Sequence, residues 1–183
     1  MEGNMLYRKY LKANSGYYGK TEVRDKGNTY ELNDIPNTYT VISDSDSVWK
    51  HYHVKGLILP DQGWKIHVTS SLEDSKSVLD KVARLCKDKK IEFKHVKDRD
   101  SMIKLNSKNA NRASSEKFMT ISPMNNEIFV ELLEIISLTI QKFKKGPYFL
   151  NDKRWKNSNV FYRYGGFKLM KMANIVLEMR KVI

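Results

Sequence analysis

Cysteine is almost absent from this chain of 183 residues, because Cys86 is the only one. A single thiol excludes an internal disulfide framework and a cysteine-based zinc site, and it favours a reducing compartment. His51 and His53 would share a strand face, but no third ligand lies at a suitable spacing, so no metal site is predicted. The sequence also lacks a Gly-rich phosphate loop that opens a helix and the Gly-x-Ser-x-Gly elbow of serine hydrolases.

Long apolar runs are missing as well. The longest one, Ile128 to Ile140, is interrupted by Glu131 and Glu134 and is too short to span a bilayer. The first residues, Met1 to Asn4, begin acidic and do not lead into the apolar core of a signal peptide. We therefore predict a soluble, cytoplasmic protein that does not act at a membrane.

Acidic residues are outnumbered: 33 Lys and Arg stand against 21 Asp and Glu, which gives a net charge of +12. Such an excess indicates an acidic partner, either nucleic acid, an anionic membrane, or a phosphorylated or acidic peptide. The alternative is a solvated surface that happens to be rich in Lys. With 40% hydrophobic and 30% charged residues, the chain is globular, and its length fits one domain.

Short apolar segments with alternating or β-branched residues predict four strands, at Asn37–Ser43, Trp64–Val68, Ile91–Val96 and Phe118–Ile121. A helix follows the second strand, with Ser71 as its N-cap and Asp74 at a capping-box position. Its apolar stripe has helical spacing and ends before Lys87; it comprises Val78, Leu79, Val82, Ala83, Leu85 and Cys86. This order predicts a right-handed strand–helix–strand unit with parallel strands.

A second amphipathic helix is predicted from Asn125 to Phe143, and Gly146-Pro147 would end it. The inner face of this helix holds Phe129, Leu132, Leu133, Ile136 and Ile140. The fold class is α/β (α+β), a single compact domain with a mixed sheet and flanking helices. We expect an irregular arm over 1–30, the compact domain over 31–167, and a helix or linker over 168–183.

The segment Gln62 to Val68 carries the most specific chemical pattern. Because alternate side chains of a strand face opposite ways, Lys65 and His67 share one face, while Trp64, Ile66 and Val68 share the other. Two proton-handling groups thus lie side by side, and Lys94 follows in the next predicted strand. The pattern indicates acid–base chemistry on an anionic substrate.

The chain resembles the N-terminal lyase domain of class III lanthipeptide synthetases, with class IV enzymes close behind. That domain is similar to the bacterial effector phosphothreonine lyases. The blocks that carry the resemblance occur in the same order in both; here they are Gln62–Val68, Phe93-Lys94, Asn106–Lys108 with Arg112 and Lys117, Gly146–Tyr148, Asp152–Arg154, and Tyr162–Phe167.

The resemblance implies that the domain eliminates phosphate from phosphoserine or phosphothreonine of a precursor peptide. Lys94 matches the general base and His67 the general acid of the family. The positions that match phosphate-binding residues are Lys65, Arg154, Arg163, Lys117, Lys108 and Arg112. A lysine crowded by cations has a lowered pKa, so it can act as a base. We expect an imidazolium beside Lys65 to supply a proton to the departing phosphate. Glu92 departs from the basic residue that some effector lyases have just before the base.

The implied partners are a phosphorylated precursor peptide with its leader, and the kinase and cyclase domains of a bacterial synthetase. No cofactor is implied, and we expect an excised domain or a stand-alone lyase. Two other classes remain open on the residues alone. One is a phosphopeptide or leader-peptide binding module without turnover. The other is a nucleic-acid binder, which the charge and the aromatic-basic interleaving at Tyr162 to Tyr164 favour.

Overall fold

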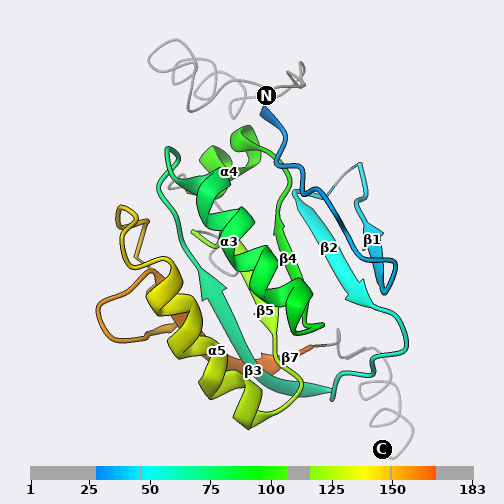
Figure 1. The fold of residues 1–183 in the computed structure, drawn as a ribbon. Helices are drawn as coiled ribbons and strands as arrows, with labels where there is room; N and C mark the ends of the chain where they lie inside the picture. Colours follow the sequence, from blue (N-terminus) through cyan, green and yellow to red (C-terminus); the bar gives the residue numbers. More distant parts are fainter. Residues whose placement is uncertain (1–27, 46, 107–115, 149, 168–183) are drawn as a thin grey trace, which may run out of the picture.

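The computed structural model describes residues 28–45, 47–106, 116–148 and 150–167. This part of the chain forms one seven-stranded sheet, in the order β1-β2-β4-β5-β3-β7-β6, and three helices (Figure 1). The strands are β1 (Tyr39–Ile42), β2 (Trp49–Val54), β3 (Gln62–Val68), β4 (Glu92–Val96), β5 (Met119–Ser122), β6 (Lys153–Arg154) and β7 (Val160–Gly166). The helices are α3 (Ser75–Asp88), α4 (Arg99–Leu105) and α5 (Asn126–Thr139).

The hydrophobic core lies between one face of the sheet and the helices α3 and α5, which cover that face side by side (Figure 1). Ile66 and Val68 of β3 and Ile121 of β5 are completely buried there. Because side chains alternate along a strand, the neighbouring positions of β3 and β5 must point to the opposite face. The polar residues Lys65, His67 and Thr120 therefore lie away from the core.

The predicted apolar stripe of α3 is confirmed. Its buried side chains are Ser75, Val78, Leu79, Val82, Ala83 and Cys86. The Ser71 hydroxyl accepts a hydrogen bond from the Asp74 amide at 3.1 Å and donates one to the Asp74 carboxylate at 3.0 Å. Ser71 thus stabilises the turn that leads into the helix, but its prediction as the N-cap is wrong, because the helix begins at Ser75 with Asp74 as its N-cap. Helix α4 was not anticipated from the sequence pattern.

The α+β fold class of a single domain is confirmed, but the expectation of a mixed sheet is wrong. All six pairings between the described strands are antiparallel. Strands β3 and β4 do run in the same direction, as a strand–helix–strand unit requires, yet they are not neighbours. Strand β5 lies between them and pairs antiparallel with both. The local pattern determines direction but does not show that a later strand inserts.

Helix α5 starts where predicted, with the Asn125 side chain accepting a hydrogen bond from the Ile128 amide at 2.9 Å. Its predicted end at Phe143 is wrong, because the helix stops at Thr139. Gly146 therefore does not end the helix and instead makes close contacts elsewhere. Its amide donates to the Asn159 side chain at 3.1 Å, and a Cβ atom at this position would lie 2.6 Å from the Ser70 amide nitrogen.

The predicted arm and C-terminal segment fall largely outside the described residues, which begin at residue 28 and end at 167. Tyr30, the last residue assigned to the arm, is buried, and its hydroxyl lies 2.8 Å from the Ser75 hydroxyl. Within the described ranges, no helix combines the length and the apolar character needed to cross a membrane.

Gly146→Ala should destabilise the domain, because the added methyl group meets the backbone of Ser70 and the Thr69 side chain. Overpacking of this kind costs about 1–3 kcal/mol of unfolding free energy. Chemical denaturation followed by circular dichroism measures the loss. Gly165→Ala is the matched control, since a Cβ there meets nothing within 4 Å and should leave stability unchanged. Equal stability of the two variants would contradict the close approach at Gly146.

Candidate active site

One lateral row of side chains crosses four strands on the face opposite the core. His67 of β3 pairs with Thr120 of β5, Thr120 pairs with Lys94 of β4, and Lys94 pairs with His51 of β2. Directly paired residues project to the same face of an antiparallel sheet. The register therefore aligns the two residues with proposed acid and base roles, with a single threonine between them.

A second polar row lies two residues along the strands. Lys65 of β3 pairs with Arg163 of β7. On β4, Glu92 pairs with Ser122 of β5, and its carboxylate also contacts the His53 ring nitrogen at 3.2 Å. Cations thus gather on the β3–β7 side, whereas Glu92 occupies the β4–β2 side and is held by His53.

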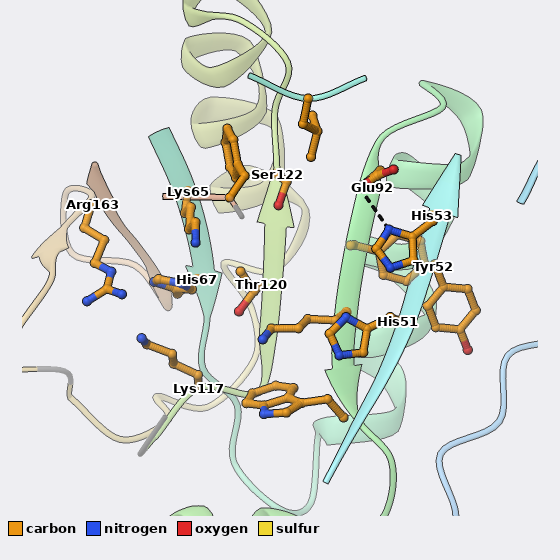
Figure 2. A pocket seen from close by; sticks show the side chains of 15 residues that line it. His51, Tyr52, His53, Lys65, His67, Glu92, Lys117, Thr120, Ser122 and Arg163 are labelled. Carbon is orange, nitrogen blue, oxygen red and sulfur yellow. Dashed lines mark hydrogen bonds and ion pairs between the residues drawn. The ribbon is translucent and has the colours of Figure 1, made fainter. Parts of the chain in front are cut away.

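These rows surround a cavity of about 220 Å³ that opens on the polar face. Figure 2 shows Lys65, His67, Lys117 and Arg163 on one side of Thr120, and His51 and His53 on the other. Lys94 also lines the cavity, with its ammonium nitrogen 4.5 Å from the centre of the Trp49 ring. Seven side chains that can carry positive charge therefore line one small cavity, which suits a compact, multiply charged anion.

His67 is oriented by a carboxylate that the sequence reading did not single out. The His67 Nδ1 atom forms a hydrogen bond with Asp152, and both side chains are almost completely buried. The other carboxylate oxygen of Asp152 lies 3.9 Å from the Nε atom of Arg163. Asp152 stands just before β6, 85 positions from His67. Its place beside Lys153 and Arg154 was visible in the sequence, but no local pattern linked it to His67.

Burial lowers the pKa of the His67 imidazole to about 4, and the neighbouring Lys117 acts in the same direction. The hydrogen bond with Asp152 raises this pKa without overcoming the burial. Burial alone would raise the pKa of Asp152, but His67 and the nearby cations lower it. The pair is therefore a neutral imidazole and a carboxylate in the unliganded protein at neutral pH. The imidazolium that the sequence analysis expects as proton donor would therefore have to form when a substrate binds.

The lysines of the cavity also have lowered pKa values. Burial is the main cause of the lowered pKa of Lys94, and the charge of Lys65 is the second. The direction agrees with the sequence-based expectation, although crowding by cations is the smaller cause. Burial and the Arg163 charge lower the pKa of Lys65, and the same two causes bring the pKa of Lys117 to about 8. All three lysines therefore lose their proton more readily than an exposed lysine does.

Not every predicted phosphate-binding residue lies at the cavity. Arg154 does not line it; its Nε atom donates to the Ser158 carbonyl at 2.7 Å. The Arg154 guanidinium also lies 5.6 Å from the centre of the Tyr148 ring and 5.7 Å from that of Phe161. Lys108 and Arg112 fall outside the described residues. The cavity therefore brings together Lys65, His67, Lys94, Lys117 and Arg163 from the predicted set.

Metal ligation was not predicted, and the described ranges hold no group of three or more His, Cys, Asp or Glu side chains that could bind a metal ion. His51 and His53 stack on each other with ring centres 5.8 Å apart. His95, next to Lys94 in sequence, points to the opposite face and is fully buried, with its Nε2 atom 3.1 Å from the Tyr52 hydroxyl. It is a core residue.

The fold and the cavity define a single α+β domain with a cation-lined pocket on the open face of its sheet. The chain belongs to the family of RamC N-terminal domains, whose family model matches residues 30–179. It is also 42% identical, over 109 residues, to the probable SapB synthase of Streptomyces coelicolor. That alignment includes 60% of this chain but 12% of the synthase, so the chain spans only a small part of that relative. The predicted family is confirmed.

Solved structures with the same fold include two effector proteins. OspF of Shigella flexneri, described as a phosphothreonine lyase, has a TM-score of 0.54 and 13% identity, over 89% of this chain and 91% of its own. The phosphothreonine lyase SpvC of Salmonella has a TM-score of 0.53 and 14% identity, over 94% and 96% of the two chains. The predicted likeness to the effector lyase fold is thereby confirmed.

The depressed pKa of His67 should make the domain less stable in acid. An unfolded histidine titrates near pH 6.5, so between that pH and about 4 the unfolded chain binds the proton and the folded protein does not. Unfolding free energy should therefore fall as the pH is lowered through this range. His67→Gln should remove roughly 3 kcal/mol of that pH dependence. Urea denaturation at a series of pH values gives both curves.

The comparison cancels the contribution of the buried His95, whose pKa is also lowered to about 4 and which contributes equally to both proteins. Parallel curves for the two proteins would show that His67 is not held neutral by the fold.

Proposed function

We propose that this domain is a carbon–oxygen lyase that eliminates phosphate from phosphoserine or phosphothreonine in a peptide. The observation that carries the proposal is the row in which Lys94 and His67 flank Thr120 at the floor of a cation-lined cavity. A site that only binds phosphate needs cations. It does not need a partly buried lysine such as Lys94 opposite a histidine that is hydrogen-bonded to its own carboxylate. The family match and the fold shared with phosphothreonine lyases support the same reaction.

In the proposed step, the neutral Lys94 amine removes the proton from the α-carbon of the substrate residue. The electron pair of that bond forms the Cα–Cβ double bond, and the Cβ–O bond breaks toward the phosphate. His67 donates its proton to the departing phosphate. The products are a dehydroalanine or dehydrobutyrine residue and hydrogen phosphate, and the step consumes no cofactor.

Binding of the substrate favours the protonated form of His67. A phosphate ester carries nearly two negative charges at neutral pH. When it enters the cavity, it offsets the positive charges of Lys117 and Arg163, which add to the effect of burial in lowering the pKa of His67. The pKa of His67 therefore rises on binding, and Asp152 stabilises the imidazolium that forms. Acid catalysis is thus confined to the occupied site.

The remaining cations hold the phosphate. Arg163 presents a guanidinium fork, which suits two phosphate oxygens at once. Lys65 is fixed by donation to the Gly166 carbonyl, and Lys117 lies close to His67 and Asp152. Together they also withdraw electrons from the breaking Cβ–O bond.

The proposed substrate is a lanthipeptide precursor with its leader, because the matched synthase and family point to such a pathway. A kinase must supply the phosphorylated residue, and a cyclase would consume the dehydrated one. Both activities would come from other parts of a synthetase or from separate proteins.

The direct test incubates the domain with a phosphoserine peptide and follows the peptide by mass spectrometry. Lys94→Ala and His67→Ala should each lower the rate of phosphoric acid loss by about 10²–10⁴-fold, the usual contribution of a general acid or base. Fluorescence polarisation should show that both variants still bind the phosphopeptide. Lys76→Ala, in an exposed pair on α3, is the control and should retain full activity.

Lys117 is the alternative base, given its low pKa. Lys117→Ala should mainly raise KM, because we assign this residue to phosphate binding. A lost kcat with unchanged KM would instead transfer the base role to Lys117. A wild-type protein that binds the phosphopeptide and leaves it intact would be a binding module.

Asp152→Asn should shift the pH profile of kcat. The carboxylate raises the pKa of His67, so its loss should move the alkaline limb, where His67 is deprotonated, to lower pH. The rate at neutral pH should fall as a result. A uniform loss of rate without a shift of this limb would mean that Asp152 only maintains the structure.

A further inference from the structure

Thr120 occupies a unique place in the proposed site, because it is paired with His67 on one side and with Lys94 on the other. We propose that Thr120 contacts the β-carbon of the substrate residue and thereby sets the preference between phosphoserine and phosphothreonine. This inference rests on the proposed lyase function and adds a specificity role for a residue that does not itself move a proton.

The geometry of the sheet places the substrate over this residue. Neighbouring strands lie about 4.8 Å apart, so the backbones of His67 and Lys94 are separated by roughly 9.6 Å, with Thr120 midway. Elimination requires the α-carbon to face Lys94 and the β-oxygen to face His67. The bond between the α- and β-carbons must therefore lie across the space above Thr120, which Figure 2 shows between His67 and His51.

The Thr120 side chain, at the floor of the cavity, cannot move away from a bound substrate. The Thr120 side chain lines the cavity and only 6% of the residue is exposed. Its strand is paired on both sides, and its β-branched side chain has few rotamers. Phosphothreonine differs from phosphoserine by one methyl group on the β-carbon, the atom closest to this floor. The methyl group of Thr120 therefore competes for space with the methyl group of the substrate.

The test compares kcat/KM for two peptides that differ only in phosphoserine or phosphothreonine. Thr120→Ser removes the methyl group and should raise the phosphothreonine-to-phosphoserine ratio by about tenfold, the lower end of what one methyl group gives in a closed pocket. Thr120→Ala should raise it in the same direction. Thr120→Val keeps the shape without the hydroxyl and should leave the ratio unchanged.

Ser122→Ala is the matched control, because Ser122 lies on the same strand and lines the same cavity but pairs with Glu92. It should not change the ratio. An unchanged or lowered ratio in Thr120→Ser, or an equal shift in Ser122→Ala, overturns the inference even if phosphate is eliminated.

A second measurement separates this inference from the proposed function. Fluorescence polarisation gives the relative affinities of the two peptides for Lys94→Ala, with and without Thr120→Ser. These affinities report on the space above Thr120 without turnover. A shift toward phosphothreonine there supports the role of Thr120 even if the wild type eliminates nothing. No shift overturns it. Thermal melting of each variant confirms that it is folded.

Discussion

The pairing of β5 with both β3 and β4 is the constraint on which the site depends. It fixes which residues of three strands share a row, and strand alternation then separates them from the core. One residue of slippage would turn His67 toward the helices and Ile66 toward the cavity. The burial of Ile66, Val68 and Ile121 against α3 and α5 opposes such slippage. Hydrophobic packing on one face therefore defines the chemistry on the other.

The cavity concentrates groups that repel one another when charged. Lys65, Lys94 and Lys117 each have a lowered pKa, with burial as the largest cause and a neighbouring cation as the next. In the proposed mechanism, an arriving phosphate dianion relieves this repulsion and raises the pKa of these lysines. Lys94 must stay neutral in that mechanism to act as a base, and Thr120 separates it from the phosphate-binding side chains Lys65 and Arg163. The centre of the Trp49 ring lies 4.5 Å from the Lys94 nitrogen and flanks it on that side.

Local patterns predicted the features that depend on neighbours in sequence. Alternation placed Lys65 and His67 on one face, and helical spacing identified the buried stripe of α3. Strand order was beyond such patterns, because β5 inserts between strands that precede it in the chain. The contact of Asp152 with His67 was not predicted for a similar reason, because only the fold brings the two residues together. A single Asp beside basic residues is an ordinary surface pattern. The role of Gly146 required knowledge of its contact with Ser70.

The hairpin of β6 and β7 completes the site. It follows Asp152 directly and contributes Arg163, whereas His67 belongs to a strand formed much earlier in the chain. Contacts between such distant positions form late and slowly, since the intervening chain must first be ordered. The residues up to α5 include His67 but neither its carboxylate partner Asp152 nor Arg163. The candidate site is therefore complete only when the strands from β3 to β7 have come together.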